Sequence, residues 1–248
     1  MAAVACVVVG IVLSLLSVGQ SVPLPTCERL IQPLENPSRD MVLGKWRSVA
    51  ESYGIAVDRE LLQSLAESAR IDVTPGSQSN TLTVVQVQKM FGVCTTLTSG
   101  MTFDNNSYHA VHPIPTTDVL LNTSCSDCLL FHQKSAAGTA QFTTLQLLSR
   151  SGRVTASELE EFEEQVKCLK LPPPIVMDPE KEPCPDPESS SSNTHFLDLT
   201  NKWHRIFSVL VTANLLQVLN ETWTEIREKV CGTWADCVGP SSVDIAFL

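Results

Sequence analysis

Basic side chains are scarce in this sequence. Seventeen Lys and Arg stand against 27 Asp and Glu, which gives a net charge of −10 at pH 7. So acidic a chain is a poor partner for the phosphates of nucleic acid or for an anionic membrane surface. We therefore expect no nucleic-acid binding, whereas a cationic ligand is compatible with the charge.

Signatures of common catalytic chemistry are also missing. The sequence contains no Gly-X-Ser-X-Gly, P-loop or His-Glu-X-X-His motif. His109 and His112 are three residues apart on a predicted strand, so their side chains point to opposite faces and would chelate a metal poorly. We expect no enzyme activity, no cofactor and no metal site.

Long apolar runs are limited to residues 4–16. Small residues follow at Gly19 and Ser21, as is typical before a signal-peptide cleavage site. Residues 1–21 are therefore predicted to be a secretory signal peptide. A transmembrane helix is the alternative, but the run is short for a bilayer, and we expect no membrane insertion.

The cysteine count supports secretion. Loss of Cys6 with the signal peptide leaves eight cysteines, and an even number in a secreted chain indicates disulfides. We expect an extracellular protein. Sequons predict N-glycosylation at Asn105, Asn122 and Asn220.

The pattern after the signal peptide is that of an extended arm followed by strands. Four prolines between residues 22 and 41 exclude long regular structure. Gly44-Lys45-Trp46 then opens a strand, where the glycine permits a sharp bend and the indole can plug the narrow end of a barrel. Residues 58–67 have helical periodicity and predict a short lid over the barrel.

Short strands separated by turn residues make up the centre of the chain. Their spacing predicts an antiparallel barrel or sandwich. The adjacent Val84 and Val85 interrupt the alternation and predict a bulge. The strands are expected at residues 70–74, 81–88, 93–99, 101–103, 107–111, 118–121, 128–133 and 141–148.

A single helix is predicted after these strands. Thr155 to Glu158 has the form of a capping box. Leu159, Phe162, Val166 and Leu169 then form one apolar stripe, which should pack against the outside of the barrel.

The arm, the Gly44-Lys45-Trp46 motif, the strand series and the late helix together resemble a lipocalin. The cysteine contexts are similar to those of the orosomucoid and apolipoprotein M branch, and within it to the saxitoxin- and tetrodotoxin-binding proteins of fish plasma. The residues carrying this resemblance are Cys27, Phe91-Gly92-Val93-Cys94, 161–172 and Lys181-Glu182-Pro183-Cys184. The resemblance implies an all-β fold, an eight-stranded antiparallel up-and-down barrel with one C-terminal α-helix packed outside.

The resemblance also implies specific roles. Disulfides Cys27–Cys168 and Cys94–Cys184 are expected, and the arginine that stacks on the base tryptophan is matched by Arg150, or by Arg153 if the last strand is shorter. The second family motif, usually Thr-Asp-Tyr, here reads Ser126-Asp127-Cys128.

A carrier function follows from the resemblance: a small ligand enters an open cup, with a guanidinium toxin such as saxitoxin or tetrodotoxin as the sharpest expectation. Lipid or basic-drug carriage, as in orosomucoid and apolipoprotein M, is the alternative. Each aromatic candidate could equally be core, and Asp72 is the first choice of carboxylate for a guanidinium ligand. The predicted ligand-binding residues are Asp72, Phe103, Tyr108, Asp118, Phe131, His132 and Phe142.

Cys125 and Cys128 have redox or metal spacing, but a lone CxxC at a turn is weak evidence for zinc. We favour a local disulfide, with pairing to the tail cysteines Cys231 and Cys237 as the alternative, and those two could also pair with each other. If either Cys125 or Cys128 were an unpaired cysteine facing inward, a lipocalin-type isomerase using a cavity thiol would be a further alternative.

The tail contains an internal repeat. Cys184 precedes Trp203 by the same 19 residues that separate Cys27 from Trp46. We predict a lipocalin domain at 22–186, a Ser-rich linker at 187–192, and a truncated second lipocalin-like repeat at 193–248. This repeat is expected to be disordered or helical; as a docking helix it would cover the barrel or mediate self-association.

Overall fold

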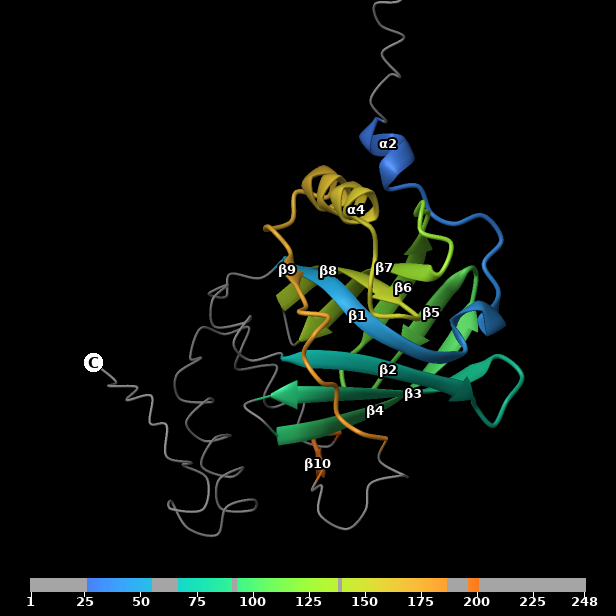
Figure 1. Ribbon diagram of the computed structural model, residues 1–248. Coiled ribbons are helices and arrows are strands. Elements are labelled where there is room, and N and C mark those ends of the chain that lie inside the picture. The colour runs from blue at the N-terminus through green and yellow to red at the C-terminus, as the bar shows by residue number, and fades with distance from the viewer. Residues whose placement is uncertain (1–25, 55–66, 91–92, 138–139, 187–195, 201–248) are drawn as a thin grey trace, which may run out of the picture.

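The computed structural model describes residues 26–54, 67–90, 93–137, 140–186 and 196–200. Eight antiparallel strands form a closed barrel in which each strand pairs with the next and the last pairs with the first (Figure 1). The predicted fold class is therefore confirmed. The strands are β1 (Gly44–Tyr53), β2 (Ser68–Pro75), β3 (Thr81–Met90), β4 (Val93–Asp104), β5 (Ser107–Ala110), β6 (Thr116–Leu121), β7 (Cys128–Ala137) and β8 (Ala140–Ser149).

Alternation along the strands separates the inside of the barrel from the outside. In β2, Ile71 and Val73 face the interior, whereas Arg70 and Asp72 form an ion pair on the outer face. This is the arrangement expected when successive side chains point to opposite faces of a sheet and apolar ones fill the interior.

A bulge in β1 changes which of its residues point inward. The pairing of β1 with β8 shifts register between Ser48 and Ala50. Because one extra residue exchanges the two faces of a strand, Trp46 faces the interior before the shift and Glu51 and Tyr53 face it afterwards.

Two details of the predicted strands are wrong. β3 pairs with β2 and β4 in continuous register, so the bulge expected at Val84 and Val85 does not occur. Gly100 does not end a strand either, because residues 93–104 form the single strand β4. Val84 and Val85 keep regular pairing because β2 and β4 lie on either side of them. Gly100 stays in the strand because it pairs with Thr83 of β3.

The predicted helix is α4 (Ala156–Cys168), and it packs outside the barrel as expected. Thr155 and Glu158 form the capping box, in which the Thr155 hydroxyl accepts from the Glu158 amide at 3.3 Å. Phe162 and Val166 are buried against the outer faces of β1 and β8, where they join a cluster that includes Leu145.

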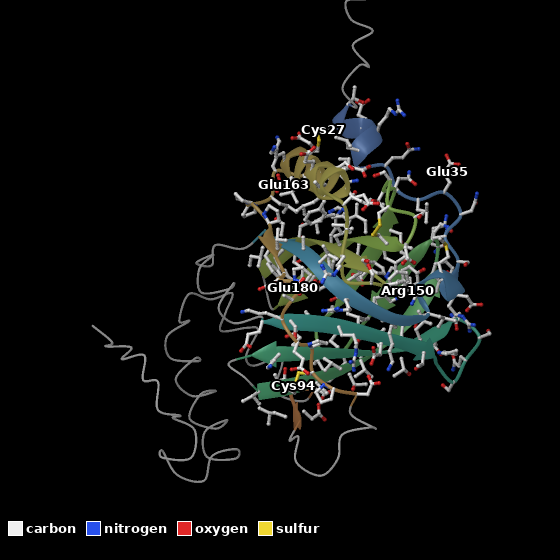
Figure 2. The ribbon with its side chains drawn as sticks, viewed as in Figure 1. Cys27, Glu35, Cys94, Arg150, Glu163 and Glu180 are labelled. Carbon is white, nitrogen blue, oxygen red and sulfur yellow. A yellow bond between two sulfur atoms is a disulfide. The ribbon has the colours of Figure 1, made fainter. Side chains whose placement is uncertain are left out.

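Short elements fasten the ends of the domain to the barrel. They are α2 (Cys27–Leu30), the 3-10 helix η1 (Arg39–Val42) and β9 (Ile175–Val176), which pairs with the second half of β1. The predicted Cys27–Cys168 disulfide joins α2 to α4, and the predicted Cys94–Cys184 disulfide joins β4 to the segment after β9. Figure 2 shows Cys27 and Cys94 on different sides of the barrel.

One piece of the tail lies on the barrel. β10 (Phe196–Asp198) pairs in parallel with the start of β4, and the Leu199 amide donates to the Thr96 carbonyl at 2.8 Å. β10 thus extends the edge of β4 beyond the point at which β5 pairs with it. The predicted signal peptide, the lid core at 55–66, the Ser-rich linker and residues 201–248, with Asn220, Cys231 and Cys237, lie outside the described residues.

Candidate functional site

The closed end of the barrel is built around Trp46. Its indole is 4% exposed, and its Nε1–H donates to the Val42 carbonyl at 2.8 Å. The guanidinium carbon of Arg150 lies 3.4 Å from the centroid of the ring, at the end of β8 (Figure 2). The expectation that Arg150 stacks on Trp46 is confirmed, and Arg153 instead pairs with Glu180.

Gly44 makes room for this arginine. Its φ is +97°, and a Cβ built there would lie 2.7 Å from Nη1 of Arg150. The glycine is therefore required both by the backbone conformation and by the close approach of the guanidinium. Arg150 also donates to the carbonyls of Leu43 at 2.7 Å and Lys45 at 3.0 Å.

Apolar side chains form the floor above Trp46. Val73, Leu82 and Leu148 pack there with Tyr108, whose hydroxyl donates to the Ser38 carbonyl at 2.9 Å. Apolar side chains predominate at this depth, so the floor is suited to an apolar part of a ligand.

The cavity above this floor measures about 180 Å³, and most of its polar side chains lie farther from the closed end. In β7 the inward positions change from Leu129 and Phe131 to Gln133 and Ser135, and β3 and β8 change in the same way. The cup therefore has an apolar floor and a polar wall. The polar residues that line this wall are Gln86, Gln88, Ser99, Thr116, Gln133, Ser135, Thr144 and Gln146.

Asp118 is a buried carboxylate of this wall, 6% exposed. Its Oδ1 is buried and has no hydrogen-bond partner among the described residues. Burial raises the pKa of Asp118 from 3.8 to about 7, and a hydrogen bond from the Gln133 side chain opposes that rise. One acceptor oxygen of this cavity-lining residue thus remains without a partner among the described residues.

Glu51 is the second carboxylate, and it is 5% exposed. Three donors reach it: Ser48 Oγ at 2.5 Å, Gln146 Nε2 at 2.7 Å and the Tyr53 hydroxyl. Burial, together with the adjacent Glu51 charge, raises the pKa of Tyr53 well above 10, so this hydroxyl keeps its proton and donates. The carboxyl oxygens of Glu51 are therefore already engaged by donors from the protein.

No Lys, Arg or His side chain lines the cavity within the described part of the chain. The two carboxylates come from β1 and β6, which are separated by β7 and β8 around the barrel. When ionised, acid groups on separate walls without a compensating base give the cup a negative potential.

Four of the predicted ligand-binding residues line the cavity: Tyr108, Asp118, Phe131 and Phe142. Phe103 lies on the same face of β4 as Met101 but deeper, where its ring is 4.9 Å from that of Tyr108 between centroids. It therefore supports the floor and does not contact the cavity.

Asp72 and His132 lie on the outer face of the barrel, which corrects the expectation that they face the cup. Asp72 accepts from Arg70 Nε at 3.0 Å, and Arg70 also reaches Asp186. His132 is paired with Val119 and Leu145 across the outer face, while its neighbour Phe131 points inward. Strand alternation decides both cases.

Glu51, Tyr53 and the glutamines were missed by sequence reasoning. Glu51 points inward because of the bulge between Ser48 and Ala50, which has no distinct residue signature. The glutamines alternate with apolar residues, as in Gln86-Val87-Gln88, but in these strands the valine faces outward. A period of two identifies the two faces without showing which is inside.

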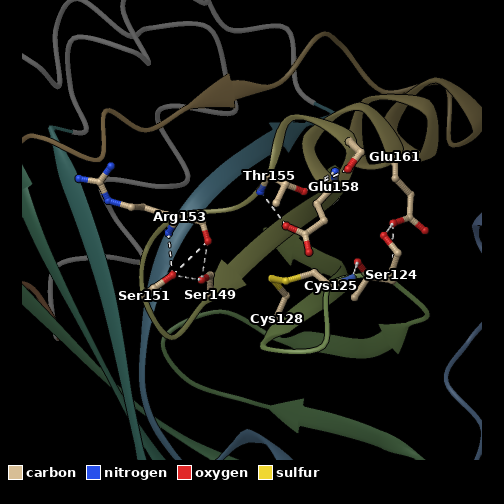
Figure 3. The surroundings of a disulfide bond; sticks show 11 residues. Ser124, Cys125, Cys128, Ser149, Ser151, Arg153, Thr155, Glu158 and Glu161 are labelled. Atoms are coloured by element: carbon tan, nitrogen blue, oxygen red, sulfur yellow. Dashed lines mark hydrogen bonds between the residues drawn. A yellow bond between two sulfur atoms is a disulfide. The ribbon is translucent and has the colours of Figure 1, made fainter.

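Cys125 and Cys128 form the predicted local disulfide at the turn between β6 and β7. Figure 3 shows this turn beside α4, where the Ser124 amide donates to Glu161 Oε2 at 2.9 Å. Neither cysteine lines the cavity. The thiol-isomerase alternative therefore loses both of the thiols on which it depended.

The other site predictions lie at the surface. Asn105 is exposed in the turn between β4 and β5, and Asn122 is half-buried near α4. Within the described ranges, no group of three or more His, Cys, Asp or Glu side chains is arranged to hold a metal. The helices described there are too short or too polar to cross a membrane.

The geometry defines a closed antiparallel barrel with a plugged base, an internal cup and a helix against its outer wall. No protein-family model and no curated protein matches the chain. Among solved structures, lipocalin 12 from rat epididymis has a TM-score of 0.56 at 16% identity, covering 69% of this chain and 100% of its own. The siderocalin Ex-FABP has a TM-score of 0.48 at 15% identity, covering 60% and 97%. The chain has the lipocalin fold.

Proposed function

We propose that this protein is a carrier that binds a small cationic ligand in the cup of its barrel. The observation that carries the proposal is the lining of the cavity, which has two buried carboxylates and no basic side chain among the described residues. A buried carboxylate without a counter-ion is costly. A cationic ligand offsets that cost, and the low dielectric of the cup strengthens the attraction.

The size and polarity of the cup favour a compact, polar ligand. The cavity of about 180 Å³ is smaller than the roughly 300–1000 Å³ typical of sites for drug-sized molecules. Side-chain amides and hydroxyls on the wall can bond a ligand with several donors and acceptors. A guanidinium group fits best, because its planar donors match the two oxygens of a carboxylate.

Guanidinium toxins such as saxitoxin or tetrodotoxin are the specific cargo that we propose. They combine the guanidinium group with a compact polar skeleton. The resemblance of the cysteine contexts to fish toxin-binding proteins supports the same cargo. Asp118 and Glu51 replace Asp72 as the carboxylates in this proposal, because Asp72 lies outside the barrel.

Carriage of a lipid or a basic hydrophobic drug is the second candidate. The apolar floor formed by Val73, Leu82 and Leu148 favours it, since such a surface accepts hydrocarbon. The polar wall and the small volume count against a long acyl chain, which would leave the glutamines and Asp118 without partners.

An extracellular location is part of the proposal. Three disulfides among the described residues are characteristic of an oxidising compartment. Modification as a plasma glycoprotein is compatible with the exposed turn at Asn105, and modification at Asn122, which is half-buried, is kept as a proposal. Self-association through the tail, residues 193–248, is kept as a proposal.

Equilibrium binding to the secreted full chain tests the cargo. Saxitoxin and tetrodotoxin would be compared at pH 8 with a sphingolipid and a basic hydrophobic drug. The proposal predicts tight binding of at least one toxin and weak binding of the lipid. Binding of the lipid or drug without binding of either toxin would assign the cup to the second candidate.

A further inference from the structure

The two carboxylates of the cup differ in the hydrogen bonds that they accept from the protein. Glu51 already accepts from Ser48, Tyr53 and Gln146. Asp118 is buried to the same degree, yet its Oδ1 accepts no hydrogen bond from the described residues. Since a buried acceptor without a partner is costly, the unpartnered oxygen on Asp118 gains more from a donor brought by a ligand than the oxygens of Glu51 do.

We propose that Asp118 is the anchor that selects the cationic ligand, and that the ligand and a proton compete for this carboxylate, so that acidification releases the cargo. This inference rests on the proposed carrier function. It adds the residue that determines specificity and the condition under which the ligand leaves.

The exchange is balanced in charge and atoms. In the empty cup the carboxyl holds a proton, which lowers the cost of its burial. When the cation binds, that proton passes to solvent, and the carboxylate accepts two hydrogen bonds from the ligand. The reverse reaction takes up one proton and frees the cation, and no covalent bond to carbon changes.

Asp118 has the properties that this exchange needs near neutral pH. Its pKa is about 7 because burial disfavours the charged form. A bound cation favours the charged form and therefore lowers this pKa. With this pKa, the Asp118 carboxyl is protonated in about half of the ligand-free molecules at pH 7 and in nearly all of them at pH 5.

The other groups that face Asp118 do not titrate in this range, with one exception to test. Tyr108 is its pairing neighbour on β5, and burial raises the pKa of Tyr108 to about 12. The pKa of Tyr53 on β1 is raised well above 10. Gln133 on β7 carries no charge, and β2, β3, β4 and β8 bring no titratable side chain to the cavity. Glu51 on β1 is the remaining acid that lines the cavity. The test must therefore distinguish an effect of Glu51 from an effect of Asp118.

Charged groups on neighbouring segments point away from the cavity. His109, His132 and Lys134 do not line it, although they lie on β5 and β7. His112, in the segment after β5, is exposed. They therefore lie outside the cavity in which Asp118 and a ligand would meet.

Calorimetric titration with methylguanidinium, whose charge is constant between pH 5 and pH 8, tests the exchange. Affinity for the full chain should fall about ninety-fold from pH 8 to pH 5, as competition with a proton at a site of pKa about 7 requires. Titrations in buffers of different ionisation enthalpy should show release of about one proton at pH 5 and about a tenth of a proton at pH 8.

Three variants assign the effect to a residue. Asp118→Asn should bind at least tenfold more weakly at pH 8 and lose the pH dependence. Glu51→Gln should keep the pH dependence, whatever its affinity. Asp72→Asn, the same change on the outer face, should behave as the wild type. Thermal unfolding of each variant establishes that it is folded.

The outcomes separate this inference from the carrier function. Binding of methylguanidinium or saxitoxin with equal affinity at pH 5 and pH 8, without proton release, overturns the exchange and leaves the carrier proposal intact. Wild-type binding by Asp118→Asn overturns Asp118 as the anchor. Failure of any guanidinium compound to bind at pH 8 overturns both proposals.

Discussion

The guanidinium carbon of Arg150 lies 3.4 Å from the centroid of the Trp46 ring. The same guanidinium donates to the carbonyls of Leu43 and Lys45, just before and inside β1. One side chain from the end of β8 therefore covers the plug of the barrel and satisfies the backbone where β1 begins. The closed end of the cup depends on this contact.

Replacement of Arg150 should lower the stability of the fold without changing which ligand the cup binds. Arg150→Ala loses the cation–π contact and two charged hydrogen bonds, and we expect a loss of about 1–3 kcal/mol in the free energy of unfolding by urea. Arg150→Lys keeps the charge but cannot bridge both carbonyls. Its free energy of unfolding should lie between those of the wild type and Arg150→Ala. Arg153→Ala, which removes an exposed ion pair with Glu180, should cost less than about 1 kcal/mol. Equal costs for the two alanine variants would contradict this account.

Gly44 should not tolerate a side chain. With φ at +97° and Arg150 Nη1 2.7 Å from the added Cβ, Gly44→Ala should destabilise by about 1–3 kcal/mol. Gly100→Ala is the matched control, because a Cβ there meets nothing within 4 Å. It should be neutral or slightly stabilising in the same urea titration. A neutral Gly44→Ala would show that the corner does not require glycine.

The stability of the empty protein should fall as pH rises from about 4 to about 7. In this window the folded chain holds a proton on Asp118, whose pKa is raised from 3.8 to about 7, whereas the unfolded chain has lost it. Asp118→Asn removes this cost, so it should raise the free energy of unfolding by about 2–4 kcal/mol at pH 8 and change it little at pH 4. Urea titrations at the two pH values, with Asp72→Asn as the control, measure this. A variant less stable than wild type at pH 8 would contradict the assignment.

The disulfides should differ in how much each contributes to the free energy of unfolding. The Cys94–Cys184 bridge spans 90 residues and the Cys125–Cys128 bridge spans 3. Loop-closure entropy predicts a loss of about 4–5 kcal/mol for paired serines at the first bridge and about 1–2 kcal/mol at the second. Urea denaturation of the two double variants gives both values, and the reverse order would show that the enclosed loop length does not set the contribution.

The sequence carries strong information on the base of the barrel. Trp46 could be predicted because it belongs to the short Gly44-Lys45-Trp46 motif. Arg150 and the two long disulfides were implied by the resemblance to lipocalins. The capping box at Thr155, also a short motif, marked the start of α4. Such features depend on local chemistry and on cysteine pairing.

The cup was less predictable because its lining depends on register. Asp118 and Asp72 both occur in alternating strands, yet one faces the cavity and the other pairs with Arg70 outside. The β1 bulge turns Glu51 inward, and the residues from Ser48 to Ala50 carry no sequence signal that predicts a bulge. Long-range pairing fixes both outcomes, and local sequence does not record it.

Equilibrium dialysis of saxitoxin at pH 8 against wild type, Asp118→Asn and Asp72→Asn tests the central claim most directly. The account predicts tight binding to wild type and to Asp72→Asn, with at least tenfold weaker binding to Asp118→Asn. Equal binding to wild type and Asp118→Asn, or a loss confined to Asp72→Asn, would contradict a cup in which Asp118 holds the cation.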